Sequence, residues 1–170
     1  MKRVAAALFG VVMGSVLSTA LLVATPGVAA AVPGASAQGN GSMIDYVITR
    51  GLSQRGVPFS YGGGGVSGPT RGVGRYASVV GFDASGLTQY AFAGAGIKLP
   101  RSSATQYQVG RKVPPAQAQR GDLIFYGPQG TQSVTLYLGN QQMLEVSDTV
   151  TVAPVRSAEM APYLVRILDS

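Results

Sequence analysis

The centre of this chain reads Phe82-Asp83-Ala84-Ser85-Gly86-Leu87-Thr88-Gln89-Tyr90. Asp83 is a good N-cap, because a carboxylate there accepts hydrogen bonds from the unpaired N–H groups of a first helical turn. Leu87 and Tyr90 lie on one face at helical spacing, so we predict a helix over residues 84–95 that closes at Gly96. Its small side chains allow close packing, and we therefore expect this helix to be central, buried and laid against a sheet.

A second helix and a glycine-rich loop are predicted before this stretch. Ser42 followed by Asp45 resembles a capping box, and the apolar residues after it recur at helical spacing, which predicts an amphipathic helix over residues 43–55. Gly56 ends this helix. Residues 62–74 are rich in glycine and follow neither the helical nor the strand period, so we predict an irregular surface loop.

The apolar period changes to two after Asp122, which is typical of strands. A short helical turn is predicted before this part, over residues 103–109. Helices first and strands second indicate an α+β fold, in which an antiparallel meander carries the central helix on one face. The predicted strands are Leu123–Tyr126, Ser133–Leu138, Met143–Ser147, Thr149–Val155 and Leu164–Leu168.

The beginning of the chain has the pattern of a secretory signal peptide. Basic residues 2–3 precede an apolar run over residues 4–23, and an alanine-rich segment offers cleavage after Ala31 or after Ala37. The run is also long enough to span a bilayer, so an uncleaved anchor stays an open alternative. We predict a signal peptide or anchor with the start of a linker over residues 1–37, a flexible linker over 38–41 and one domain over 42–170.

The composition excludes several kinds of site. The 170 residues include no cysteine and no histidine, so disulfides, Cys/His zinc sites, thiol nucleophiles and imidazole bases are impossible. The sequence implies no metal and no other cofactor. A formal net charge of +6 favours acidic partners through an attraction that salt weakens, and an ordinary solvated surface explains it equally well. Because the basic residues are scattered, we expect no nucleic-acid binding.

Five segments, taken in order, resemble the NlpC-type cell-wall cysteine peptidases. Residues 82–90 resemble the Asp-Cys-Ser-Gly-Leu signature of that family, with alanine in the cysteine position. The resemblance spans residues 43–168 and implies a papain-like fold, in which N-terminal helices pack on a C-terminal antiparallel sheet. The other four segments are Pro58–Gly63, Leu99–Ser103, Arg120–Phe125 and Ser133–Gly139, which resemble the Tyr-x-Trp-Gly-Gly, Leu-Pro-Arg, Gly-Asp-Leu and His-Val-Gly-Ile-Tyr-Leu-Gly segments of the family.

The chain departs from this family at two positions that carry its chemistry. Ala84 stands at the position of the nucleophilic cysteine, and Ser133 at that of the histidine base. A methyl group has no lone pair with which to attack an amide, and a serine hydroxyl is far too weak a base to accept a proton at neutral pH. Glu145 stands where the family carries the third residue, which orients the base. The resemblance thus implies a pseudoenzyme without peptidase activity.

The resemblance also implies that the substrate groove remains. Tyr61 either walls this groove or packs in the core, and Arg101 pairs either with a ligand carboxylate or with an internal one, Asp83 or Asp122. Glu145 either contacts a ligand amine or is solvated or locally hydrogen-bonded. A three-residue turn at 139–141 places it on the sheet face of Ser133, whereas a two-residue turn places it on the other face. The expected groove residues are Tyr61, Asp83, Ala84, Ser85, Arg101, Ser133 and Glu145.

From these residues we expect a secreted or cell-wall associated monomer that binds peptidoglycan stem peptides without cutting them. Two other functions stay open. The first is regulation of an active cell-wall hydrolase through a protein interaction. The second is residual serine hydrolysis, with Ser85 or Ser133 as the nucleophile. The last function needs a base, and the candidates do not lie at a spacing that marks a known serine–lysine site. Those candidates are Lys98, Lys112, Asp83 and Glu145.

Overall fold

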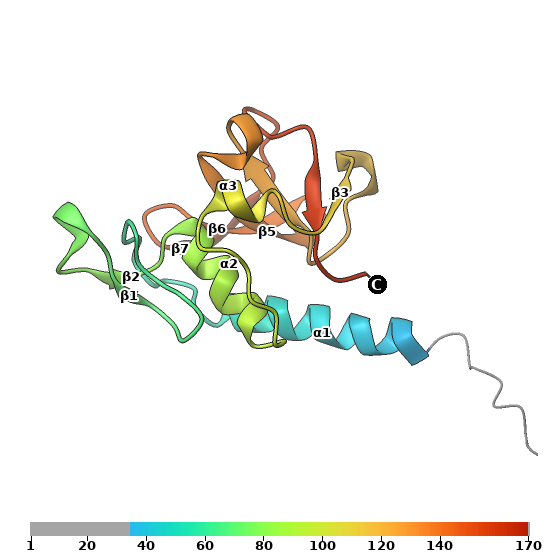
Figure 1. The fold of residues 1–170 in the computed structure, drawn as a ribbon, viewed down its shortest axis with the longest axis horizontal. Coiled ribbons are helices and arrows are strands. Elements are labelled where there is room, and N and C mark those ends of the chain that lie inside the picture. Colours follow the sequence, from blue (N-terminus) through green and yellow to red (C-terminus); the bar gives the residue numbers. More distant parts are fainter. Residues whose placement is uncertain (1–34, 170) are drawn as a thin grey trace, which may run out of the picture. The chain divides into compact units, whose positions relative to one another are not determined.

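The structure, a computed structural model, describes residues 35–169 of the 170-residue chain. It has the predicted α+β architecture, in which N-terminal helices pack on a six-stranded antiparallel sheet (Figure 1). The order of the strands across this sheet is β3-β8-β4-β5-β6-β7. The helices are α1 (Ala35–Leu52), α2 (Ala84–Ala93) and α3 (Ser103–Gln106), with 3-10 turns η1 (Gly74–Tyr76), η2 (Pro115–Gln117) and η3 (Pro128–Gly130). The strands are β1 (Thr70–Arg71), β2 (Val80–Gly81), β3 (Arg111–Val113), β4 (Leu123–Tyr126), β5 (Ser133–Gly139), β6 (Gln142–Val146), β7 (Val150–Pro154) and β8 (Leu164–Arg166).

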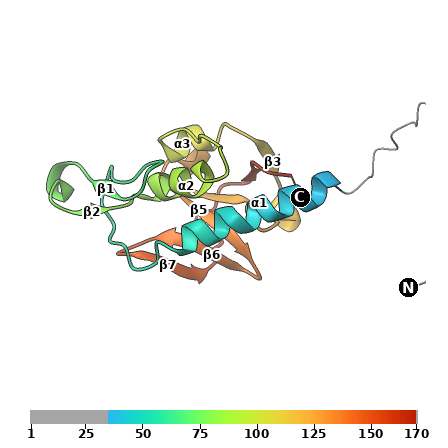
Figure 2. The ribbon, with the colours of Figure 1, turned by 90° about the horizontal axis from the view of Figure 1, so that it is seen from below.

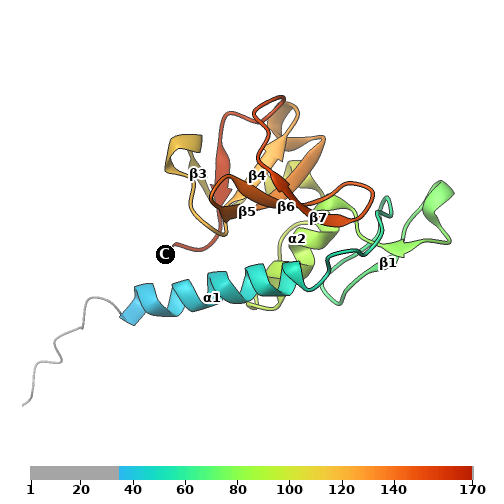
Figure 3. The ribbon, with the colours of Figure 1, turned by 180° about the vertical axis from the view of Figure 1, so that it is seen from behind.

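Helices α1 and α2 cover one face of the sheet (Figures 2 and 3). Val47 of α1 and Phe92 of α2 are fully buried in one apolar cluster with Phe125 of β4 and Leu136 of β5. Burial of a side chain of this size contributes about 2 kcal/mol, so this layer holds α2 firmly across the sheet. The prediction of a central, buried helix after Asp83 is confirmed.

The first helix differs from its prediction at both ends. It begins at Ala35 and ends at Leu52, so residues 38–41, which we predicted as a flexible linker, are helical. Ser42 does not cap the helix, because its hydroxyl donates a hydrogen bond to the carbonyl oxygen of Gly39, 2.8 Å away. A serine that bonds back to an earlier carbonyl is compatible with a helix interior, and for this reason the capping-box pattern misplaced the start.

The predicted meander is confirmed for β4 to β7, which follow one another both in the chain and in the sheet. β8 does not extend it, because this strand lies beside β4 and pairs with β3 on its other side. The sequence did not predict β3. This strand has only three residues, and its two exposed cations, Arg111 and Lys112, leave no alternation of apolar residues to recognise.

The turn between β5 and β6 decides which residues share a sheet face. Residues 140–141 have positive φ values of 50° and 58°, as the two central residues of a type I′ turn require. A β-bulge at the end of β5 adds one residue to that strand, and Leu136 therefore pairs with Leu144. This register places Glu145 on the face of Ser133, the outcome that we predicted for a three-residue turn.

Residues 61–81 form an arm that projects from the N-terminal end of α2 (green in Figure 1). β1 and β2 pair antiparallel within it, with Thr70 opposite Gly81, and η1 lies between them. The loop predicted over residues 62–74 therefore contains short regular elements. The strands β1 and β2 of the arm have two residues each, which is too short to produce a recognisable apolar period in the sequence.

The apolar run over residues 4–23 and the proposed cleavage site after Ala31 lie outside the described residues, whereas the site after Ala37 lies among them. The signal peptide, the anchor and the domain boundaries thus stay predictions. Within residues 35–169, none of the helices combines the length and the apolar character that a membrane crossing needs.

Candidate functional site

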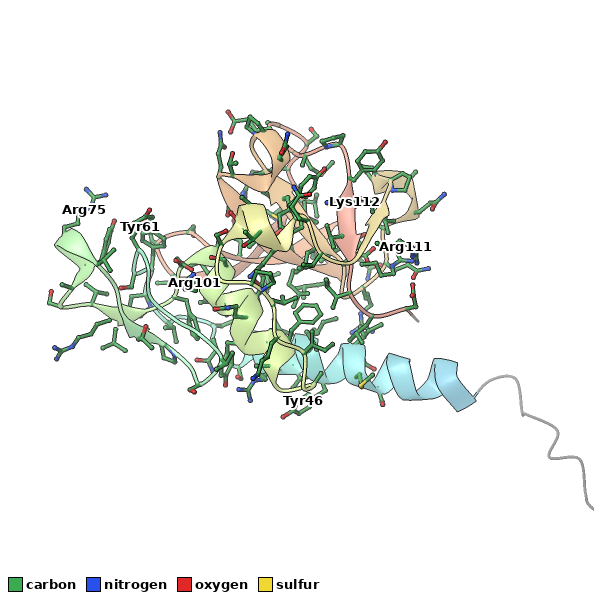
Figure 4. All side chains as sticks on the ribbon, in the orientation of Figure 1. Tyr46, Tyr61, Arg75, Arg101, Arg111 and Lys112 are labelled. Carbon is green, nitrogen blue, oxygen red and sulfur yellow. The ribbon has the colours of Figure 1, made fainter. Side chains whose placement is uncertain are left out.

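A groove of about 550 Å³ opens at the N-terminal end of α2. Its walls come from the base of the arm, the first turn of α2, the segment that leads into α3 and the beginning of β5. In Figure 4, Tyr61 and Arg101 lie close to each other where the arm meets α2. The structure thus brings together six of the seven residues predicted for the groove: Tyr61, Asp83, Ala84, Ser85, Arg101 and Ser133.

The carboxylate of Asp83 holds the arm and α2 together. Its Oδ1 accepts a hydrogen bond from the backbone N–H of Gly86 at 2.7 Å, which caps α2 as predicted. Its Oδ2 accepts one from the N–H of Gly62 in the arm at 3.1 Å. A Cβ at position 86 would lie 2.4 Å from the carbonyl oxygen of Gly63, so only glycine lets the arm backbone approach the helix this closely.

The guanidinium of Arg101 is paired inside the groove wall. Its two Nη atoms donate hydrogen bonds to the two carboxylate oxygens of Asp83, each at 2.8 Å. They also donate to Ser85 Oγ at 2.9 Å and to the carbonyl oxygen of Gly63 at 3.1 Å. Of the alternatives left open for Arg101, the structure contains the pair with Asp83, while Asp122 pairs elsewhere. Arg101 therefore stabilises the groove wall, and the two guanidinium nitrogens that could bind a ligand carboxylate already bind Asp83.

Asp83→Ala is expected to lower the free energy of unfolding by about 2 kcal/mol, because it removes both the N-cap of α2 and the partner of Arg101. Asp83→Ser keeps a capping oxygen and should recover about 1 kcal/mol of this loss. Urea denaturation of the two variants measures the difference. Equal losses in the two variants would mean that capping contributes nothing here.

The first turn of α2 offers electrostatic stabilisation but no nucleophile. Ala84 occupies the first helical position, where unpaired N–H groups favour negative charge, yet its side chain is a methyl group. The hydroxyl of Ser85 donates to Asp83 Oδ1 at 3.2 Å and accepts from Arg101. Among the described residues that line the groove there is no lysine and no histidine, and the one carboxylate is paired. The groove therefore contains neither an activated nucleophile nor a free general base.

Glu145 shares the sheet face of Ser133 but does not line the groove. Its carboxylate accepts a hydrogen bond from Arg156 Nη1 at 2.7 Å, and the Arg156 guanidinium lies 4.8 Å from the ring centre of Tyr126. Burial raises the pKa of Tyr126, and the charge of Glu145 adds to this increase. The hydrogen bond to the Arg156 backbone and the charge of Arg156 partly offset it. Because Arg156 engages the carboxylate, a contact between Glu145 and a ligand stays a prediction.

The groove also contains residues that the sequence did not predict. Most of them adjoin predicted ones, and that adjacency was the available signal: Ser102 and Ser103 follow Arg101, and Gln132 precedes Ser133. Val146 follows Glu145, and of these two neighbours the structure places Val146 in the groove lining instead of the predicted Glu145. These residues are Phe59, Gly62, Ser102, Ser103, Thr131, Gln132 and Val146.

Within the described part of the chain, no group of three or more His, Cys, Asp or Glu side chains is arranged to hold a metal ion. The groove offers hydroxyls, one side-chain amide, aromatic rings and an internally neutralised ion pair. This set of groups can bind a polar ligand through hydrogen bonds and apolar contacts.

The NlpC/P60 family profile matches residues 56–169. RipB, a peptidoglycan endopeptidase of Mycobacterium tuberculosis, is 53% identical over 163 residues, which cover 94% of this chain and 66% of RipB. RipA, a peptidoglycan endopeptidase of the same organism, is 55% identical over 146 residues, which cover 81% of this chain and 31% of RipA. The chain therefore spans less than two thirds of the length of these curated relatives.

Solved structures of RipD and RipA are similar to this one. RipD of Mycobacterium tuberculosis, a non-catalytic NlpC/p60 domain protein adapted to peptidoglycan binding, is 70% identical with a TM-score of 0.73, over 74% of this chain and 98% of that chain. RipA mutated at a cysteine is 56% identical with a TM-score of 0.75, over 77% of this chain and 65% of that chain. RipA has also been solved with mutations at a histidine and at a glutamate, and both structures have the same TM-score of 0.75.

Proposed function

The chain belongs to the NlpC/P60 family, and from this premise we propose that it binds peptidoglycan stem peptides in the groove at α2 without cleaving them. The observation that carries the proposal is a well-formed groove with no activated nucleophile and no free base. The relatives RipA and RipB are peptidoglycan endopeptidases, whereas this chain contains no cysteine and no histidine. Cleavage by the chemistry of cysteine peptidases is therefore impossible for it.

The spacing of three residues supports the assignment of the lost catalytic positions. RipA has been mutated at a cysteine, a histidine and a glutamate, and the separations between these three positions equal those from Ala84 to Ser133 and from Ser133 to Glu145. On this basis Ala84 replaces the cysteine, Ser133 replaces the histidine, and Glu145 is retained. The non-catalytic RipD, which is 70% identical, supports the same interpretation.

The groove has the size and lining that a peptide ligand needs. Its volume of about 550 Å³ is typical of sites that enclose a small ligand. Ser102, Gln132 and Ser133 supply donors and acceptors for peptide groups. Phe59 and Tyr61 supply aromatic surface for the alkyl parts of the ligand. The leader predicted over residues 1–37 would deliver this groove to the cell wall.

Ala84→Trp is expected to reduce retention on peptidoglycan at least tenfold, because an indole at position 84 fills the groove. The matched control is Ala116→Trp, which adds the same side chain to η2, where Ala116 is exposed and does not line the groove. Co-sedimentation of the protein with insoluble peptidoglycan measures retention, and circular dichroism checks that both variants fold. If Ala84→Trp sediments as well as Ala116→Trp, the ligand binds elsewhere and the proposal fails.

Salt is expected to weaken this sedimentation. The net charge is +6 for the whole chain and +4 (6 − 2) without Lys2 and Arg3 of the predicted leader. Stem peptides carry free carboxylates, so long-range attraction contributes to binding and is screened as the ionic strength rises. Retention should fall severalfold between about 0.05 M and 0.5 M sodium chloride. Retention that does not change over this range would mean that charge contributes nothing to the affinity.

A further inference from the structure

A second, smaller pocket opens beside the groove, on the side of the arm. Its volume is about 330 Å³, and two of its lining residues, Phe59 and Tyr61, also line the groove. We call this cavity the side pocket. Figure 4 shows Tyr61 between Arg101, which belongs to the groove, and Arg75 at the tip of the arm. The residues of the side pocket are Phe59, Tyr61, Val73, Gly74, Arg75 and Tyr76.

The side pocket is built from contacts that fix its walls. The N–H of Val73 donates a hydrogen bond to the carbonyl oxygen of Tyr61 at 2.8 Å, which joins the two sides of the arm. The ring of Tyr76 packs edge to face on that of Phe59, with centroids 5.1 Å apart. The buried hydroxyl of Ser60 donates to the carbonyl oxygen of Val79 at 2.7 Å. Contacts within the arm and between the arm and Phe59 therefore fix the walls of this pocket.

The side pocket exposes apolar surface that nothing in the described chain covers. The exposed fractions of Tyr61 and Val73 are 62% and 55%. Large apolar side chains that lie together at the surface, beside a concave site, commonly mark a place where a ligand binds. A ligand in the groove that continues past Tyr61 reaches this surface directly.

Arg75 gives the side pocket its charge. No acidic residue occurs in the sequence between Asp45 and Asp83, so the arm has no carboxylate of its own. Among residues 35–169, no ion pair involves Arg75, whose guanidinium lies 5.0 Å from the ring centre of Tyr76. Arg101, in contrast, is held by both oxygens of Asp83. Of the arginines that line the two cavities, Arg75 is the one that can receive a carboxylate from a ligand.

We infer that the side pocket is a second subsite of the groove, which binds a carboxylate of the stem peptide through Arg75 while Tyr61 and Val73 pack on its alkyl groups. The inference rests on the proposed function, because it extends the same ligand from one cavity to the next. It also moves anion recognition from Arg101, where the sequence suggested it, to the arm.

The test uses two synthetic probes and the purified protein. One probe is the tripeptide L-alanyl-γ-D-glutamyl-diaminopimelate with free carboxylates, and the other is the same peptide with its carboxylates converted to amides. Isothermal titration calorimetry measures the affinity for each. Arg75→Gln should weaken binding of the acidic peptide by roughly five- to tenfold, because a charge-assisted bidentate contact is lost. The same variant should bind the amidated peptide as the unmodified protein does.

The matched control is Arg71→Gln, which removes the same charge from β1 of the arm, where Arg71 is exposed and lines neither cavity. It should change either affinity by less than about twofold. The inference is wrong if Arg75→Gln binds the acidic peptide normally, loses both peptides equally or matches Arg71→Gln. If the unmodified protein binds neither peptide nor peptidoglycan, the proposed function fails and takes this inference with it.

Discussion

The double variant Ala84→Cys/Ser133→His is expected to release soluble fragments from peptidoglycan at least about a hundredfold faster than either single variant. The new thiol would stand at the first position of α2, where the helix dipole favours the thiolate. The neighbouring carboxylate of Asp83 would oppose this effect, but its charge is balanced by the bidentate pair with Arg101. The imidazole would enter the same groove from the beginning of β5.

The two single variants are the matched controls for this result. Ala84→Cys has a nucleophile without a base, and Ser133→His has a base without a nucleophile, so neither should cleave. Alkylation by iodoacetamide at pH 7 reports whether the thiol is ionised. A folded double variant with a reactive thiolate that still releases nothing would contradict the proposal, because it would show that the groove no longer holds the substrate in a reactive position.

Asp122→Ala is expected to lower the free energy of unfolding by about 3–5 kcal/mol. The exposed fractions of Asp122 and Arg166 are 1% and 8%, and the Nε and Nη2 of Arg166 each donate to a different carboxylate oxygen at 2.7 Å. The hydrogen bonds that Arg166 donates to Asp122 raise the pKa of the guanidinium, as does the charge of the carboxylate. An arginine side chain stays protonated at any pH used for folding. Removal of the carboxylate leaves this buried cation without a counter-ion, so that only the carbonyl oxygen of Gln117, 2.9 Å from Nη2, still accepts a hydrogen bond from it.

Asp45→Ala provides the comparison for this loss. Asp45 pairs with Arg120 at 3.0 Å, but both side chains are more than half exposed, so the change should cost less than about 1 kcal/mol. Urea denaturation at one pH and one ionic strength measures both variants. Similar losses for the two would mean that burial adds nothing to the pair between Asp122 and Arg166.

Local patterns in the sequence predicted the parts of the fold that depend on neighbouring residues. Asp83 caps α2 as expected, because capping involves only the first helical turn. The strands β4 to β7 were also predicted, because each is a short run rich in residue types that favour strands. The predicted start of α1 was wrong. The hydroxyl of Ser42 can either cap a helix or bond back to an earlier carbonyl within one, and the local pattern does not distinguish these two roles.

Features that depend on distant residues could not be predicted. The partner of Arg101 was left open between a ligand carboxylate, Asp83 and Asp122, and the choice depends on how the segment between α2 and α3 returns to the N-terminal end of α2. We predicted the sheet face of Glu145 from the number of residues in the turn after β5. The structure reaches the same register through a β-bulge in β5, which the length of the turn does not reveal. The side pocket likewise depends on how Phe59 and η1 come together.

The most direct test of the account is mass spectrometry of the soluble fraction after the purified protein has been incubated with peptidoglycan, with Ala84→Cys/Ser133→His as the positive control. The account predicts that the unmodified protein sediments with the wall material and that no new peptide fragments appear, however long the incubation. Fragments that accumulate in proportion to the amount of unmodified protein would contradict it, because a chain without cysteine or histidine would then be an active wall hydrolase.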